Sequence, residues 1–247
     1  MSAPLIEVDS VSKSFWIPDE PRHTVREHVL AGFAPRPRRR LPVLDSVSLQ
    51  LHKGEALGVM GANGCGKSTL LKLVCGIYIP DEGTITARAA ITPILDLGVG
   101  WNPELDAVDN VYLIGGLMGL SLPEIGRTLD AILDFAELRP FARMHLKHFS
   151  SGMAARLAYA VAFQAVRDVL VLDEVLAVGD AGFKQRCEAR YREIRAAGHT
   201  TLVVSHEPYI VRAFCDRALM LRDGRIVAEG TASDVADEYL ASLVKTG

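Results

Sequence analysis

A glycine-rich stretch with one lysine is the clearest chemical signal in the sequence. It reads Gly-Ala-Asn-Gly-Cys-Gly-Lys-Ser-Thr and matches the phosphate-binding P-loop pattern G-x-x-x-x-G-K-[ST]. Its glycines let backbone N–H groups converge on an anion at the start of a helix. We expect Lys67 to reach the β- and γ-phosphates of a nucleotide and Ser68 to bind Mg²⁺. The predicted nucleotide-binding residues are Gly61, Asn63, Gly64, Cys65, Gly66, Lys67, Ser68 and Thr69.

An acidic pair follows a second apolar stretch. Residues 169–172 are Val-Leu-Val-Leu, and Asp173 and Glu174 come next. Such a run is typical of a buried parallel strand, whose carboxyl end meets the ligand crevice of an open α/β sheet. We expect Asp173 to hold Mg²⁺ through its water shell and Glu174 to polarise the attacking water as a general base. Acidic pairs are more often solvated surface, but this position in a P-loop protein favours catalysis.

A histidine ends the next apolar run. Residues 201–204 are Thr-Leu-Val-Val, followed by Ser205 and His206. A lone histidine is commonly a satisfied core residue. At the carboxyl end of a buried strand, however, it can hydrogen-bond the γ-phosphate and position the water. We therefore predict that His206 is a second catalytic residue.

Alternating strands and helices must position these groups. The apolar run 56–60 and the apolar segment 70–75 flank the P-loop as strand and helix. This alternation predicts a parallel sheet with right-handed crossovers. Residues from about 96 to 164 are mostly helical in pattern, with Ser121 and Glu124 at capping-box spacing. Further strands are expected at 5–8, 43–51, 84–87, 91–95, 218–221 and 225–229, and a last helix around 235–243.

Two features near the N-terminus each allow a structural and a functional interpretation. Phe15, or its neighbour Trp16, can stack on an adenine ring, or it can pack within a small sheet. Residues 17–42 form an insert in which a helical apolar pattern over 25–33 precedes Arg36, Arg38, Arg39 and Arg40. The insert is either a solvated loop or a short amphipathic helix near anionic lipid headgroups or a membrane partner.

Composition narrows the function classes. The chain has 247 residues, 49% of them hydrophobic, and its net charge of −3 argues against a general nucleic-acid binder. No apolar run approaches the roughly 18 residues that a membrane span needs. The N-terminus lacks the basic and apolar regions of a secretory signal, so none is expected. The four cysteines are far apart and form no C-x-x-C pair, which indicates reduced thiols in a cytosolic protein.

A further motif makes the pattern specific. Ser150-Ser151-Gly152-Met153, before a helix carrying Arg156, resembles the signature motif of ATP-binding cassette (ABC) transporter ATPases, although the commoner form is L-S-G-G-Q. With the Walker A motif at 61–68, the Walker B strand at 169–173 and the switch His206, this resemblance covers the whole chain in family order. It implies an α/β P-loop ATPase core with a parallel sheet, a small antiparallel β subdomain and an inserted helical subdomain. It also implies a homodimer in which Ser150, Ser151 and Gly152 hold the γ-phosphate of ATP on the other subunit's P-loop.

The sequence from Leu172 to Asp180, with Phe183 after it, is similar to that of ATPases exporting bacterial surface polysaccharides: O-antigen, capsule or teichoic acid. The insert at 17–42 also resembles one that these ATPases carry near the substrate entrance. The resemblance implies that Asp180 is a D-loop carboxylate contacting the opposite subunit. It further implies a transmembrane permease partner and a peripheral position on the cytoplasmic face of the bacterial inner membrane. We expect one domain over 1–247, with a core in 1–95 and 167–247 and a helical subdomain in 96–166.

Two departures from the family pattern and three other functions complete the prediction. The usual Q-loop glutamine is absent between Leu95 and Asn110, and Asp96 is the nearest polar candidate for the residue near Mg²⁺. No carbohydrate-binding domain is expected after Gly247, so we expect the membrane subunit or the insert to recognise any glycan. The alternatives are an ABC ATPase for another cargo, a soluble ATP-dependent switch acting on DNA or ribosomes, and a binding-only module. Soluble switch ATPases usually have paired cassettes or long coiled arms, and this sequence shows neither. The intact catalytic residues argue against a binding-only module.

Overall fold

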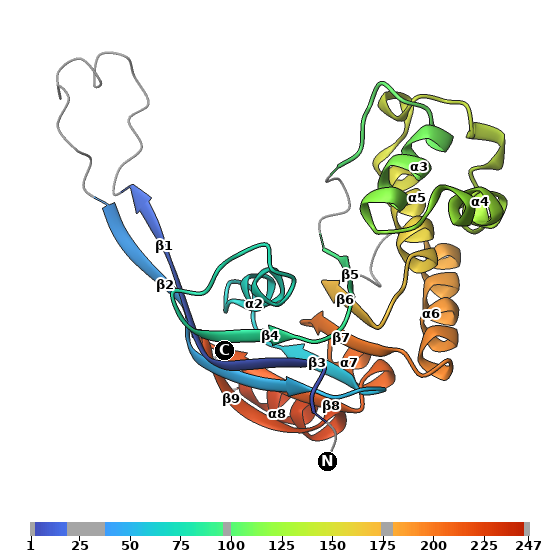
Figure 1. The fold of residues 1–247 in the computed structure, drawn as a ribbon. Coiled ribbons are helices and arrows are strands. Elements are labelled where there is room, and N and C mark those ends of the chain that lie inside the picture. The colour runs from blue at the N-terminus through green and yellow to red at the C-terminus, as the bar shows by residue number, and fades with distance from the viewer. Residues whose placement is uncertain (1–2, 19–37, 96–99, 174–179, 245–247) are drawn as a thin grey trace, which may run out of the picture.

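The computed structural model describes residues 3–18, 38–95, 100–173 and 180–244 (Figure 1). Its main sheet has six strands in the order β5-β6-β7-β3-β8-β9. The first five pair in parallel, with Asp173 level with Val204 and Met60 level with Ser205. The strands are β3 Ala56–Met60, β5 Ile91–Ile94, β6 Val169–Asp173, β7 Thr200–Ser205, β8 Arg217–Arg222 and β9 Arg225–Thr231.

Strand β9 pairs antiparallel with β8 at the edge of this sheet. A two-residue turn of Asp223 and Gly224 joins them, and both residues have positive φ, 48° and 76°. Such turns match the twist of a hairpin, and glycine adopts this conformation without steric cost. The alternation of strands and helices therefore ends in a hairpin here.

A second, antiparallel sheet has the order β2-β1-β4, with β1 Ile6–Pro18, β2 Arg38–Leu51 and β4 Glu82–Ala87. Strand β2 begins at Arg38, not at Val43 as expected. It is an edge strand, where Pro42 opposite Ser14 is tolerated because one row of N–H groups is not needed for pairing. Strand β1 pairs with β4 only as far as Ser12, so beyond that point β1 and β2 project as a two-stranded arm (Figure 1).

Helices α3 and α4 lie to one side of the main sheet, joined to it through α5 (Figure 1). Helix α4 begins with the expected capping box, in which Ser121 and Glu124 exchange hydrogen bonds. Among the described residues, no helix is long and apolar enough to cross a membrane. The helices are α2 Lys67–Val74, α3 Ala107–Leu117, α4 Leu122–Ala136, α5 Ser151–Gln164, α6 Ala181–Ala196, α7 Pro208–Phe214 and α8 Ala232–Val244, with short 3₁₀ turns at Arg139–Phe141 and Leu146–His148.

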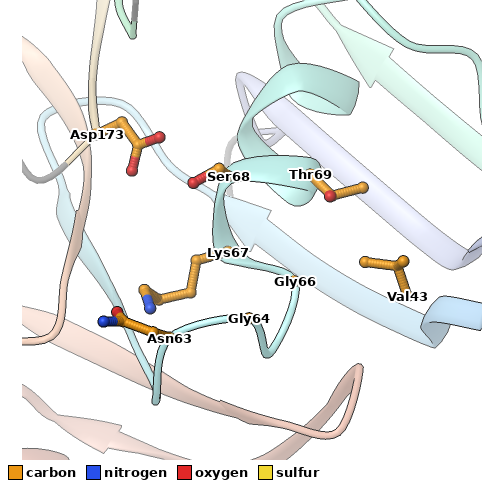
Figure 2. Close-up of a pocket in the computed structure, with 8 residues that line it drawn as sticks. All are labelled: Val43, Asn63, Gly64, Gly66, Lys67, Ser68, Thr69 and Asp173. Carbon is orange, nitrogen blue, oxygen red and sulfur yellow. The ribbon is translucent and has the colours of Figure 1, made fainter. Parts of the chain in front are cut away.

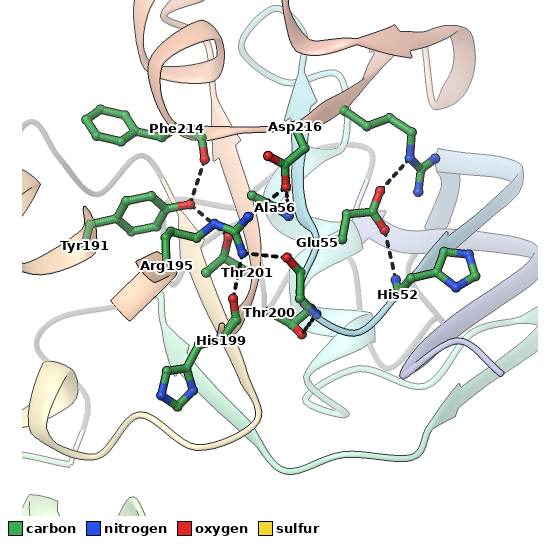
Figure 3. Close-up of polar contacts among 12 residues, drawn as sticks. His52, Glu55, Ala56, Tyr191, Arg195, His199, Thr200, Thr201, Phe214 and Asp216 are labelled. Atoms are coloured by element: carbon green, nitrogen blue, oxygen red, sulfur yellow. Dashed lines mark hydrogen bonds and ion pairs between the residues drawn. The ribbon is translucent and has the colours of Figure 1, made fainter. Parts of the chain in front are cut away.

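Polar contacts fix the amino-terminal edge of the main sheet (Figure 3). Arg195 on α6 donates to the His199 carbonyl at 2.7 Å and pairs with Asp216 at 2.7 Å. The same Asp216 carboxylate accepts from the Ala56 N–H at 2.8 Å, so one network joins α6 to the starts of β3 and β8. The opposite edge, where the strands end, carries Asp173 and, directly after β7, His206.

Candidate functional site

A cavity of about 550 Å³ opens at the carboxyl edge of the sheet, over the P-loop. Strand β3 ends at Met60 and helix α2 begins at Lys67, so the loop between them is the expected strand–turn–helix. Figure 2 shows the residues of β2, the loop, α2 and β6 that surround this space. The lining residues are Val43, Asn63, Gly64, Gly66, Lys67, Ser68, Thr69 and Asp173.

Gly66 makes the tight approach of this loop possible. Its φ of 112° lies in a backbone region that residues with a side chain rarely adopt. A Cβ there would lie 2.7 Å from Leu44 Cδ2 and 2.9 Å from the Val43 carbonyl oxygen. No side chain caps the first turn of α2, so its N–H groups are not occupied by a cap. Together with the helix dipole, these donors make a suitable cradle for phosphate.

Lys67 is buried at the base of the cavity, with 5% of its surface exposed. Its ammonium donates to the Gly61 carbonyl at 2.8 Å and to the Ala62 carbonyl at 3.0 Å. A buried charge needs such partners, and they hold the side chain along the loop. The same geometry presents a positive charge to an anion bound in the loop.

Asp173 and Ser68 provide oxygen atoms on facing sides of the cavity. Asp173 ends β6 and Ser68 lies in the first turn of α2, and their side chains point toward one another (Figure 2). Carboxylate, hydroxyl and phosphate oxygens are the ligands that Mg²⁺ prefers. The donor set, with the cradle of N–H groups beside it, therefore fits a magnesium-bound triphosphate.

His206 lies at the same edge as Asp173 and the P-loop. It directly follows β7, which lies between β6 and β3 in the sheet. Its side chain is exposed, and it is not among the residues that line the cavity. Glu174, which follows Asp173 in the chain, and Asp96 both lie outside the described residues.

Comparison with known proteins agrees with this geometry. The family model described as ABC transporter matches residues 44–177. The protein named ABC transporter protein AbcA, from Aeromonas salmonicida, is 38% identical over 242 residues, which cover 97% of this chain and 77% of that protein. This chain belongs to the ABC transporter family.

Two relatives have names that specify an exported molecule. An O-antigen export system ATP-binding protein RfbB from Klebsiella pneumoniae is 37% identical over 83% of both chains. A teichoic acids export ATP-binding protein TagH from Bacillus anthracis is 34% identical over 82% of this chain, but the match covers only 37% of that protein. The prediction that the chain is an ABC transporter ATPase is confirmed.

Solved structures support the predicted fold class. A structure described as the ATP binding subunit of an ABC transporter has a TM-score of 0.77 at 24% identity, covering 97% of this chain and 99% of that one. A dimeric ATP-binding cassette described as bound to ADP and Pi has a TM-score of 0.73 at 22% identity, covering 92% of this chain and 98% of that one. The predicted α/β cassette, with its small antiparallel sheet and helical subdomain, is confirmed.

The predicted signature residues lie on another part of the chain. Ser150 is the N-cap of α5, and its side-chain oxygen accepts from the Met153 N–H at 3.2 Å. Ser151 and Gly152 form the first turn of that helix. Among the described residues, none that lines the P-loop cavity comes from α3, α4 or α5. One copy of the chain therefore does not bring the signature residues to its own P-loop.

Two other predicted residues also lie away from the cavity lining. Phe15 packs edge-on against Tyr78 with ring centroids 5.4 Å apart, and Lys13 lies over its ring at 5.7 Å. Asp180 is the N-cap of α6, where its side chain accepts from the Phe183 N–H at 2.9 Å. Contact of Phe15 with adenine and of Asp180 with a second subunit stays a prediction.

Val43 is the cavity residue that sequence reasoning missed. It lies on β2, beside Gly66 and Thr69 in Figure 2. The available signal was indirect: an apolar residue at the expected start of a strand, with no chemistry of its own. Only the packing of the small sheet against the P-loop places it in the site.

Proposed function

We propose that this chain is the ATP-hydrolysing subunit of an exporter for a lipid-linked cell-surface polysaccharide. It would work on the cytoplasmic face of the bacterial inner membrane, bound peripherally to a transmembrane permease. The observation that carries this proposal is the match to an O-antigen export protein at 37% identity over 83% of both chains. The P-loop cavity supplies the geometry for the ATPase step.

Each cavity group has a role when ATP and Mg²⁺ are bound. The N–H groups at the start of α2 and the Lys67 ammonium hold the phosphates. Ser68 and Asp173 would hold Mg²⁺, which would supply positive charge to neutralise the charge that develops on the phosphate oxygens. Glu174, next to Asp173 in sequence, takes a proton from the attacking water, and His206 at the same edge orients that water.

A second copy completes the site in this proposal. The signature turn at 150–152 does not line the cavity of its own chain, although its helix start offers donors and a positive dipole end to an anion. In a head-to-tail homodimer it would face the ATP on the partner's P-loop. ATP would then favour the closed pair and hydrolysis would release it, in a two-state cycle biased by the ligand.

Loss of a surface glycan tests the exported cargo. A strain lacking this chain is expected to lose one surface polysaccharide and to accumulate its lipid-linked precursor inside the cell. The parent sequence should restore both, and a membrane protein should co-purify with it. Normal surface glycan in the deletion strain, with a different exported molecule missing, would assign the ATPase to another cargo.

Deletion within the insert tests its proposed role in transport. The helix expected at 24–33 lies outside the described residues. Removing residues 24–33 is expected to leave basal ATPase activity within about twofold, because the described residues that line the P-loop cavity come from β2, the loop, α2 and β6. Export measured in cells should fall clearly. Normal export by this variant would make the insert a passive loop.

A further inference from the structure

Four charged side chains join the helical subdomain to the core around one phenylalanine, and the proposed function does not use them together. Glu137 follows the last residue of α4, and Arg156 lies in α5, behind the signature turn. Asp180 caps α6 and Arg186 lies in its second turn. Phe183, on the same helix, is fully buried beneath them.

Glu137 forms ion pairs with two arginines from different helices. It adopts the left-handed conformation, with φ 57°, and so turns the chain at the end of α4. Its carboxylate pairs with Arg186 at 2.6 Å and with Arg156 at 2.5 Å. Hydrogen bonds from Arg186 and then Arg156 hold the pKa of Glu137 below its usual range, so this carboxylate stays ionised near neutral pH.

Arg156 also binds a second carboxylate, through its other terminal nitrogen. One guanidinium nitrogen donates to Glu137 and the other to Asp180, whose second oxygen caps α6 by accepting from the Phe183 N–H. The side chain of Arg156 is 19% exposed and that of Asp180 is 62% exposed, so solvent screens this ion pair from the Asp180 side. A planar guanidinium can hold two carboxylates in a fixed geometry, which a lysine ammonium cannot.

Phe183 contacts both guanidinium groups. Arg156 and Arg186 lie over its ring at 5.3 and 5.6 Å from the centroid. The ring packs edge-on against Phe135 of α4 at 5.7 Å and Tyr159 of α5 at 6.1 Å. The ionic contacts therefore lie on an aromatic core that α4, α5 and α6 share.

We propose that Arg156 is a positioning residue that fixes the signature turn at 150–152 relative to Asp180. Both would act across the dimer interface, so this inference rests on the proposed function. Ser150 and Arg156 belong to one continuous helix, less than two turns apart, so the guanidinium contacts set the direction of the helix start. Holding Glu137 and Asp180 at once makes the start of α5 and the start of α6 move as one unit.

The test compares Arg156→Gln and Arg156→Lys with the matched control Arg190→Gln. Arg190 lies on α6, and within the described part of the chain its ion pair is with Glu193 of its own helix at 2.8 Å. For each full-length variant we would measure kcat and KM for ATP, ATP-dependent dimerisation, affinity for a fluorescent ATP analogue, and Tm. Arg156→Gln should lower kcat about tenfold and weaken dimerisation, with analogue affinity unchanged, because the P-loop cavity is intact. The control should stay within about twofold of the parent.

Arg156→Lys separates the fork geometry from simple charge. It should keep the parent Tm but stay impaired in kcat and dimerisation, since one ammonium cannot hold both carboxylates in the guanidinium geometry. The double variant Glu137→Gln/Arg156→Gln should lower kcat and dimerisation no more than the more impaired of its two single variants. Parental kcat and dimerisation in Arg156→Gln, or full rescue by lysine, would overturn the inference. The inference would also be overturned if the affinity for the ATP analogue fell in parallel with Tm. If the parent itself neither hydrolyses ATP nor dimerises, the proposed function fails first.

Discussion

Lys67→Ala is expected to reduce ATP turnover by at least about 100-fold, because the variant removes the positive charge nearest the phosphates. Lys67 is buried at the base of the cavity and is held there by the carbonyls of Gly61 and Ala62. Hydrogen bonds to a charged group contribute about 1.5–3 kcal/mol each, so nucleotide affinity should fall as well. Turnover is measured by phosphate release, and affinity with a fluorescent ATP analogue.

The matched control for this variant is Lys53→Ala. Lys53 is exposed in the turn before β3, at the amino-terminal edge of the sheet, so its loss removes the same charge far from the cavity. Its turnover should equal that of the parent. The Tm of Lys67→Ala should remain close to the parent value, which shows that the fold is intact. Undiminished turnover in Lys67→Ala would remove the assignment of the P-loop as the ATP site.

Sequence reasoning located the P-loop site well because its chemistry is local in the chain. Nine consecutive residues carry the cradle, the lysine and one metal ligand, and the apolar runs on either side identify the strand and the helix. Asp173 was found for a related reason. It ends a continuous apolar strand, and parallel strands bring their carboxyl ends to one edge of the sheet.

The contacts that sequence reasoning missed join residues far apart in the chain. Val43 reaches the cavity only because the small sheet packs against the P-loop, where the Val43 carbonyl approaches Gly66. Glu137 and Arg186 carry no pattern of their own, because ionic side chains at helix ends and on helix surfaces are common, and Arg156 was noted only as part of the helix after the signature turn. Strand β2 extends to Arg38 because a strand at the edge of a sheet tolerates Pro42. The sequence alone does not show that this strand lies at an edge, because the strand order is not known at that point.

Glu174→Gln is expected to bind ATP normally but to lower turnover by about 10²- to 10⁴-fold, since an amide cannot take the proton from water. The substitution keeps the size of the side chain and leaves Lys67, Ser68 and Asp173 in the cavity. If two copies enclose ATP, blocking hydrolysis should also preserve the closed pair. With ATP and Mg²⁺ the variant should therefore elute as a dimer, and without nucleotide as a monomer.

This variant separates the catalytic base from the dimer. Glu188→Gln is the matched control, because Glu188 pairs with Arg192 on α6 and lines no part of the cavity. Parental turnover in Glu174→Gln would mean that another group is the base. Lost turnover without an ATP-dependent dimer would leave the base in place but contradict the shared site. Adding Ser150→Ala should then test the geometry. It removes the cap of α5, which does not line the P-loop cavity of the same chain, so weaker dimerisation with unchanged ATP affinity is expected if the signature turn acts on the partner's nucleotide.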